Sequence, residues 1–134
     1  MAVAPINKVR QVVEYAITEI PVSKINLGIP NYGYDWPLPY EKGVTKASTI
    51  GNVRAVQLAI EHGAVIGFDE TAQTPFFNYI ENGVEHEVWF EDVRSMQAKF
   101  NLVKEFNLRG MGYWQLMRFF LANWILLDSE FDIL

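Results

Sequence analysis

The chain has 134 residues, room for one domain, and 50% of them are hydrophobic, which excludes an intrinsically disordered chain. Its net charge of −5 argues against a nucleic-acid-binding surface, and no apolar run approaches the roughly 18 residues that a membrane span needs. It contains no cysteine and only two histidines, which excludes disulfides, thiol nucleophiles and Cys-ligated or multi-histidine metal sites, so we expect no metal and no cofactor.

The first predicted elements are a helix and a buried strand. Apolar residues at helical spacing predict a helix from about Ile6 to Ile20, which Pro21 ends. The short apolar run 24–30 predicts a buried strand, and this order is typical of an α/β unit. Residues 31–41 are rich in aromatic residues and proline, and we expect an irregular loop there, at the end of a strand where α/β folds bind ligands.

The middle of the chain predicts a small α+β module. We expect a helix over about 51–62, capped by Ser48 or Thr49, and then a short strand over 64–68. Further along, Asn82-Gly83 separates two runs of residues with high strand propensity. Asn-Gly in that setting is the strongest short-range hairpin signal, so we expect a β-hairpin around it.

The last third returns to the alternation of helix and strand. Asp92 can start a third helix that Asn107 ends, and residues 110–116 form a second candidate for a buried strand. The apolar tail 119–127 predicts a short helix. We expect the two buried strands to be neighbours in a parallel sheet, and two strands are too few to close a core because parallel sheets are covered on both faces.

Three segments resemble glycoside hydrolase family 18. Ile25 to Trp36 is similar to the family's seventh strand, which typically reads Gly-hydrophobic-Pro-x-Tyr-Gly. Val88 to Ser95 resembles the segment that leads into the seventh helix, and Leu108 to Leu116 resembles the eighth strand, in which a Gly precedes a Trp. The resemblance is strongest to the spore-germination branch, the cortical-fragment-lytic N-acetylglucosaminidases.

The resemblance implies an α/β fold that is the C-terminal portion of a (β/α)8 TIM barrel. Residues 1–36 and 91–134 would form this partial barrel unit, with the order helix–strand, helix–strand, helix. Residues 37–90 would form a small α+β insertion domain between the two barrel strands, with its β-hairpin around Asn82-Gly83.

The implied function is the substrate-groove portion of a glycoside hydrolase that acts on N-acetylglucosamine-containing glycans, either peptidoglycan fragments or chitin-like oligosaccharides. The family's catalytic signature, Asp-x-x-Asp-x-Asp-x-Glu, does not occur in these 134 residues. We therefore assign no catalytic residue and expect the chain alone to be inactive. The alternative is a non-catalytic module that binds carbohydrate, or a structural module that self-associates.

The resemblance also points to substrate-binding residues. Trp114, at the end of the eighth strand, would form the floor under the sugar at the cleavage site, because an aromatic face packs against the C–H face of a pyranose. Asp35 is a candidate hydrogen-bond partner for a sugar hydroxyl, with a turn-forming role as the alternative. The other candidates are aromatic residues that could instead be buried in the core: Tyr32, Tyr34, Trp36 and Trp89.

The expected partner is an N-acetylglucosamine-containing oligosaccharide, with no nucleic acid and no membrane. The open sheet would be covered by a second copy of the chain or by the N-terminal part of the barrel. Sequence alone does not determine localisation, although the resemblance suggests the spore envelope or secretion to the cell wall. Adjacent carboxylates at 69–70 and 91–92 are interpreted as a loop and a helix start, not as an acid/base pair.

Overall fold

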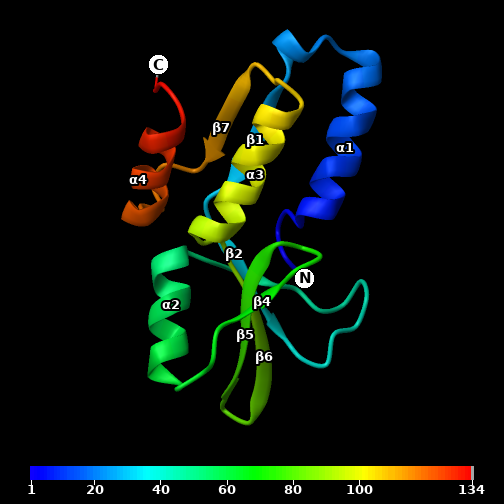
Figure 1. Cartoon of the computed structure of the whole chain (residues 1–134). Helices are drawn as coiled ribbons and strands as arrows, with labels where there is room; N and C mark the ends of the chain where they lie inside the picture. The colour runs from blue at the N-terminus through cyan, green and yellow to red at the C-terminus, as the bar shows by residue number, and fades with distance from the viewer. Residues whose placement is uncertain (134) are drawn as a thin grey trace.

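The computed structural model describes residues 1–133, and its elements fall into two groups (Figure 1). The first group contains a two-stranded sheet and three helices: β1 (Asn26–Pro30), β7 (Gly110–Trp114), α1 (Ile6–Glu19), α3 (Val93–Glu105) and α4 (Leu121–Glu130). The second contains a five-stranded sheet and one helix: β2 (Gly33–Pro37), β3 (Ser48–Ile50), β4 (Gly67–Asp69), β5 (Thr74–Glu81), β6 (Val84–Trp89) and α2 (Asn52–Glu61). No helix within residues 1–133 is long and apolar enough to cross a membrane.

Strands β1 and β7 pair in parallel, with Asn26 opposite Gly110 and Pro30 opposite Trp114. This confirms the prediction that the two strands are neighbours in a parallel sheet. The prediction that both are buried is wrong for this chain, because no residue of β7 is buried and only Ile29 and Pro30 of β1 are. Helix α3 lies beside them in Figure 1, with α1 and α4 to either side. Ile29 of β1 packs with Phe100 of α3 in a core where both are fully buried, so the apolar face of α3 is what covers one side of the sheet.

Helix α3 begins where the sequence predicts because Asp92 caps it. The Asp92 carboxylate accepts hydrogen bonds from the backbone N–H groups of Arg94 and Ser95, and the Ser95 hydroxyl accepts one from the Asp92 N–H. Such a reciprocal capping box typically stabilises a helix by about 1 kcal/mol. Asn107 follows the helix with a φ of 49°, a left-handed conformation that ends it.

The five-stranded sheet has the strand order β3-β2-β6-β5-β4 and is antiparallel throughout. The predicted hairpin around Asn82-Gly83 is confirmed: it joins β5 and β6, and both turn residues have positive φ. Helix α2 packs on one face of this sheet, where Leu58 and Ala55 meet Phe77 and other buried residues. The opposite face is not covered by α2.

The structure corrects the prediction that residues 31–41 form an irregular loop. Residues 33–37 form strand β2, which pairs with β3 on one side and β6 on the other. A Cβ added at Gly33 would lie 2.2 Å from the Trp89 carbonyl oxygen, so only glycine permits this close approach. The five-stranded sheet thus starts at Gly33, and the predicted boundary between residues 36 and 37 falls inside β2.

Three smaller predictions also need correction. Ser48 and Thr49 do not cap α2 but belong to strand β3, and the N-cap is Gly51, which makes no side-chain capping bond. Strand β4 covers Gly67–Asp69, not 64–68. Strand β7 ends at Trp114, so the segment after it begins two residues earlier than predicted.

Candidate functional site

A row of aromatic rings runs along strand β2. Side chains two apart on a strand lie on the same face, which brings Tyr32, Tyr34 and Trp36 into line. Neighbouring ring centroids are 5.8 Å and 5.7 Å apart and meet edge to face, and Tyr40 extends the row at a further 5.7 Å from Trp36. This spacing is favourable for aromatic pairs, so the rings hold one another in place.

Trp89 widens the aromatic row on the same face. It lies opposite Tyr34 across the β2–β6 ladder, and its ring stacks on Phe76 with centroids 4.9 Å apart. Its indole N–H donates to the Glu87 carboxylate. The structure therefore brings Tyr32, Tyr34, Trp36 and Trp89 together on the sheet face that α2 leaves open.

Trp114 lies at the end of β7 and is 70% exposed. It lines a shallow recess of about 150 Å³ together with Tyr32, Thr49, Gln115 and Arg118, so Trp114 and the start of the aromatic row face a common space. The Trp114–Gln115 peptide bond is cis. Burial, more than the nearby Tyr34 phenol, raises the pKa of Tyr32, which therefore stays a neutral hydrogen-bonding group at neutral pH.

Asp35 is on the wrong face to join these aromatic residues. Its carboxylate accepts a hydrogen bond from the Tyr79 hydroxyl at 2.7 Å and lies 2.8 Å from Nδ1 of His86. These partners belong to the face covered by α2, and His62, the residue that caps the C-terminus of α2, also packs on the Tyr79 ring. The geometry therefore argues against Asp35 as a sugar ligand, and its place in a strand excludes the turn-forming alternative.

Sequence reasoning missed a buried ion pair at the start of α3. The sequence predicts Glu91 only as an acid at a helix start, yet its side chain is 1% exposed and lies 2.8 Å from Lys99 Nζ, which is equally buried. Burial raises the pKa of Glu91, while the Lys99 ammonium acts in the opposite direction. The available signal was Lys99 itself, because it follows Met96 by three positions on the apolar side of the helix.

Sequence reasoning also missed Asn31, a 1% exposed asparagine between β1 and β2. The sequence predicts Asn31 only as the first residue of the loop 31–41, with no role of its own. Its side chain is hydrogen-bonded to three other segments of the chain. A lone polar residue after a strand gives no sequence signal for such a position.

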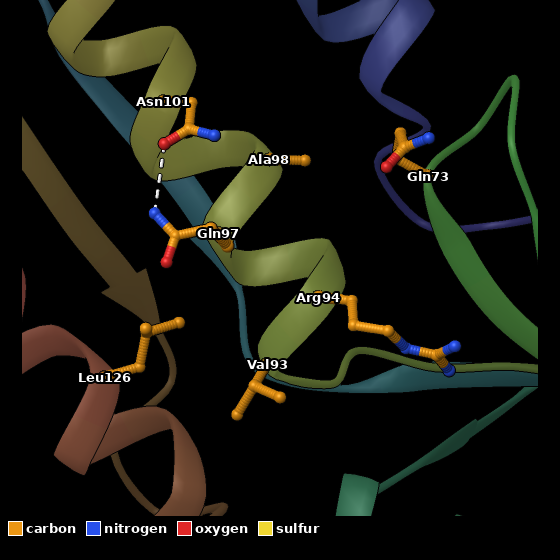
Figure 2. A pocket seen from close by; sticks show the side chains of 7 residues that line it. All are labelled: Gln73, Val93, Arg94, Gln97, Ala98, Asn101 and Leu126. Atoms are coloured by element: carbon orange, nitrogen blue, oxygen red, sulfur yellow. Dashed lines mark hydrogen bonds between the residues drawn. The ribbon is translucent and has the colours of Figure 1, made fainter.

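A second hollow, of about 450 Å³, lies along α3. Figure 2 shows its lining, in which Gln97 donates a hydrogen bond to Asn101. Its lining residues are Gln73, Val93, Arg94, Gln97, Ala98, Asn101 and Leu126. The hollow has no aromatic side chain and contains none of the predicted substrate-binding residues, so it is not a candidate for the sugar site.

Comparison with known proteins identifies the family of the chain. The family model for glycosyl hydrolases family 18 matches residues 3–118. The chain belongs to glycosyl hydrolase family 18. It is 52% identical over 133 residues to the cortical fragment-lytic enzyme of Bacillus subtilis (strain 168), an alignment that covers 98% of this chain and 31% of that protein. The putative sporulation-specific glycosylase YdhD of the same strain is 45% identical, with the same coverage.

Solved structures of family 18 proteins share the α/β fold. The spore cortex-lytic enzyme SleL of Bacillus megaterium QM B1551 superposes with a TM-score of 0.94 at 52% sequence identity, over 100% of this chain and 32% of that one. The chain thus spans about a third of the length of these family 18 relatives. The resemblance seen in the sequence segments is confirmed.

Proposed function

We propose that the chain is the substrate-groove portion of a family 18 glycoside hydrolase that acts on N-acetylglucosamine-containing glycans, either peptidoglycan fragments or chitin-like oligosaccharides. The observation that carries the proposal is the exposed ring of Trp114, which shares a recess with Tyr32 at the end of the aromatic row on β2. Flat apolar rings with hydrogen-bonding edges suit a sugar, whose faces are apolar and whose rim is polar.

The barrel interpretation of the fold belongs to the same proposal. Strands β1 and β7 would be two adjacent strands of a (β/α)8 barrel, and the β2–β6 sheet with α2 would be an insertion between them. In support, Gly28 and Gly112 are paired, both are exposed, and a Cβ at either would meet no atom within 4 Å. That open face is where the remaining barrel strands would enclose a common interior.

In this proposal Trp114 forms the floor beneath one sugar, and Tyr32, Tyr34, Trp36 and Trp89 form a wall along which further sugars stack. Among the described residues, the carboxylates nearest the site are already engaged. Asp35 is bonded to Tyr79 and His86, and Glu87 accepts from the Trp89 indole and lies 3.5 Å from the Met1 amino group. Glu91 is buried against Lys99. The residues described here would therefore bind and orient a glycan without cleaving it.

The test is a titration with N-acetylated chitooligosaccharide. We expect Trp114→Ala to weaken binding by about 1 kcal/mol, or roughly fivefold, since it removes one stacking platform. Tyr15→Ala is the control, because Tyr15 is an equally exposed aromatic residue on α1, outside the recess and the aromatic row. Equal affinities for the parent chain and the Trp114 variant would refute the proposed platform.

A second function, self-association, is favoured by a different observation. Large apolar side chains are exposed along β7, the segment after it and α4: Trp114, Leu116, Met117, Phe119, Leu121 and Ile125. Contiguous apolar surface of this kind marks an interface. We propose that a second copy of the chain, or the N-terminal part of a barrel, covers it.

A further inference from the structure

Asn31 is at the centre of a buried hydrogen-bond network. Its side-chain N–H donates to the carbonyl oxygen of Arg118 at 2.6 Å. Its side-chain oxygen accepts from Asn52 at 3.2 Å and from Asn123 at 3.4 Å. Asn52 and Asn123 are themselves 2% exposed, so the network lies in a region that water does not reach.

The network joins segments that are far apart in the sequence. Asn31 links β1 to β2, Asn52 is the first residue of α2, and Asn123 lies in α4. The Asn52 side-chain oxygen Oδ1 also accepts from the Glu91 backbone N–H at 3.0 Å, immediately before α3. One amide therefore connects the five-stranded sheet and its helix with the two-stranded sheet and its helices.

Three walls of the recess beside Trp114 are attached to this residue. The Asn31 backbone N–H donates to the Trp114 carbonyl oxygen at 2.8 Å. Tyr32 is the next residue in the chain, and Arg118 is held through its carbonyl oxygen while its guanidinium donates to Thr49. Trp114, Tyr32 and Arg118 are thus attached to Asn31 directly, and Thr49 is attached through Arg118.

The chemistry of the position requires asparagine. The side chain must donate to one carbonyl oxygen and accept from two amide groups, and a carboxamide does both. An aspartate at this position would place a carboxylate oxygen against the Arg118 carbonyl oxygen, leaving two buried acceptors in contact. The segment that follows Trp114 would then have to move away.

We propose that Asn31 is a positioning residue that holds the Trp114 platform and the segment 115–118 in place for sugar binding. It does not touch the sugar but sets the distance between Trp114 and Tyr32 through its bonds to both sides of the recess. The inference rests on the proposed sugar-binding function for its effect on affinity. The positioning itself is a separate, structural claim.

The test uses the chain labelled with 5-fluorotryptophan and observed by ¹⁹F NMR. The chain has four tryptophans, and the variants Trp114→Phe and Trp36→Phe identify the Trp114 and Trp36 resonances. We expect Asn31→Asp to shift or broaden that resonance more than the Trp36 resonance, with an unchanged far-ultraviolet circular dichroism spectrum. Asn101→Asp, the same substitution at an exposed position on α3, should leave the four resonances where they are.

Sugar titration then measures the consequence. Asn31→Asp should weaken chitooligosaccharide binding at least fivefold, and Asn101→Asp should not. In the Trp114→Ala background the Asn31 substitution should cause no additional loss, because the platform that it positions is gone. An additional loss of the same size would overturn the proposal, since Asn31 would then act independently of Trp114.

The two arms separate the two claims. If Trp114→Ala leaves sugar binding unchanged, the proposed function fails, while the ¹⁹F shift in Asn31→Asp would still support positioning. A Trp114 resonance that does not move in the folded Asn31→Asp variant would overturn the positioning role. If that variant does not fold, Asn31→Ala removes the bond to the Arg118 carbonyl oxygen without adding a charge, and an unmoved Trp114 resonance there would overturn it as well.

Discussion

Replacing Lys99 with methionine should destabilise the chain severely. The Lys99 ammonium lies 2.8 Å from the Glu91 carboxylate, and both side chains are almost completely buried. Methionine preserves the length and apolar stem of lysine but leaves the carboxylate without its counter-ion. Breaking a buried pair from one side typically costs about 3–5 kcal/mol, a large share of the roughly 5–15 kcal/mol by which a domain is stable.

The loss should depend on pH. Burial already raises the pKa of Glu91, and removal of Lys99 takes away the main influence that lowers it. Because the pKa of this carboxyl is higher in the folded state, its burial does not lower the free energy of unfolding at a pH below the unfolded pKa, where the group is neutral in both states. The free energy of unfolding falls as pH rises from the unfolded pKa to the folded pKa and then stays constant. The stability of the variant should therefore be closest to that of the parent chain at about pH 4.5, and the difference should be largest at about pH 8.

Urea unfolding followed by circular dichroism at both pH values measures this difference. Lys104→Met is the matched control, because Lys104 is on the same helix but pairs with Glu130 at the surface, where an ion pair contributes about 0–1 kcal/mol. The double variant Glu91→Gln, Lys99→Met should recover much of the loss. A Lys99→Met chain as stable as the Lys104→Met chain at about pH 8 would refute the reasoning.

Three further predictions follow from the same structure. The chain assayed on a chromogenic chitooligosaccharide should show no turnover, because a positioned general acid typically contributes about 10²–10⁴-fold and none is available; activity within tenfold of a full-length homologue would contradict this. Light scattering at micromolar concentration should show self-association through the apolar surface of β7 and α4, whereas a 15 kDa species would contradict it. Burial raises the pKa of Tyr113 to about 12, so the free energy of unfolding falls from about pH 10 upward as this phenol ionises on unfolding. Tyr113→Phe should therefore lessen the loss of stability with rising pH, and parallel curves of stability against pH for the two chains would contradict it.

Much of the secondary structure follows from local sequence patterns. The helix over residues 6–19 follows from apolar residues at helical spacing ended by Pro21, and α3 begins at the capping side chain of Asp92. Asn82-Gly83 determines its hairpin because both residues tolerate the positive φ that the turn requires. In each case the residues that decide the outcome lie within a few positions of one another, and this is why inspection of the sequence predicts them.

The site was predicted in part. The resemblance to family 18 identified Trp114 and the aromatic residues of β2, and the structure brings Trp114 and Tyr32 to one recess. Asp35 was assigned to the wrong face because residues 31–41 were interpreted as a loop, in which the alternation of side chains has no meaning. Once Gly33–Pro37 is a strand, the side chain after Tyr34 must point to the opposite face.

The sequence by itself determined the helices, the hairpin and the family. Tertiary structure decided β2, which is a strand because β6, some fifty residues away, supplies its hydrogen-bond partners. It also decided that Glu91 and Lys99 share a buried site and that Asn31 meets Asn52, Asn123 and the Arg118 carbonyl. A buried polar group needs partners, and the folded chain supplies them from distant segments that no local pattern identifies.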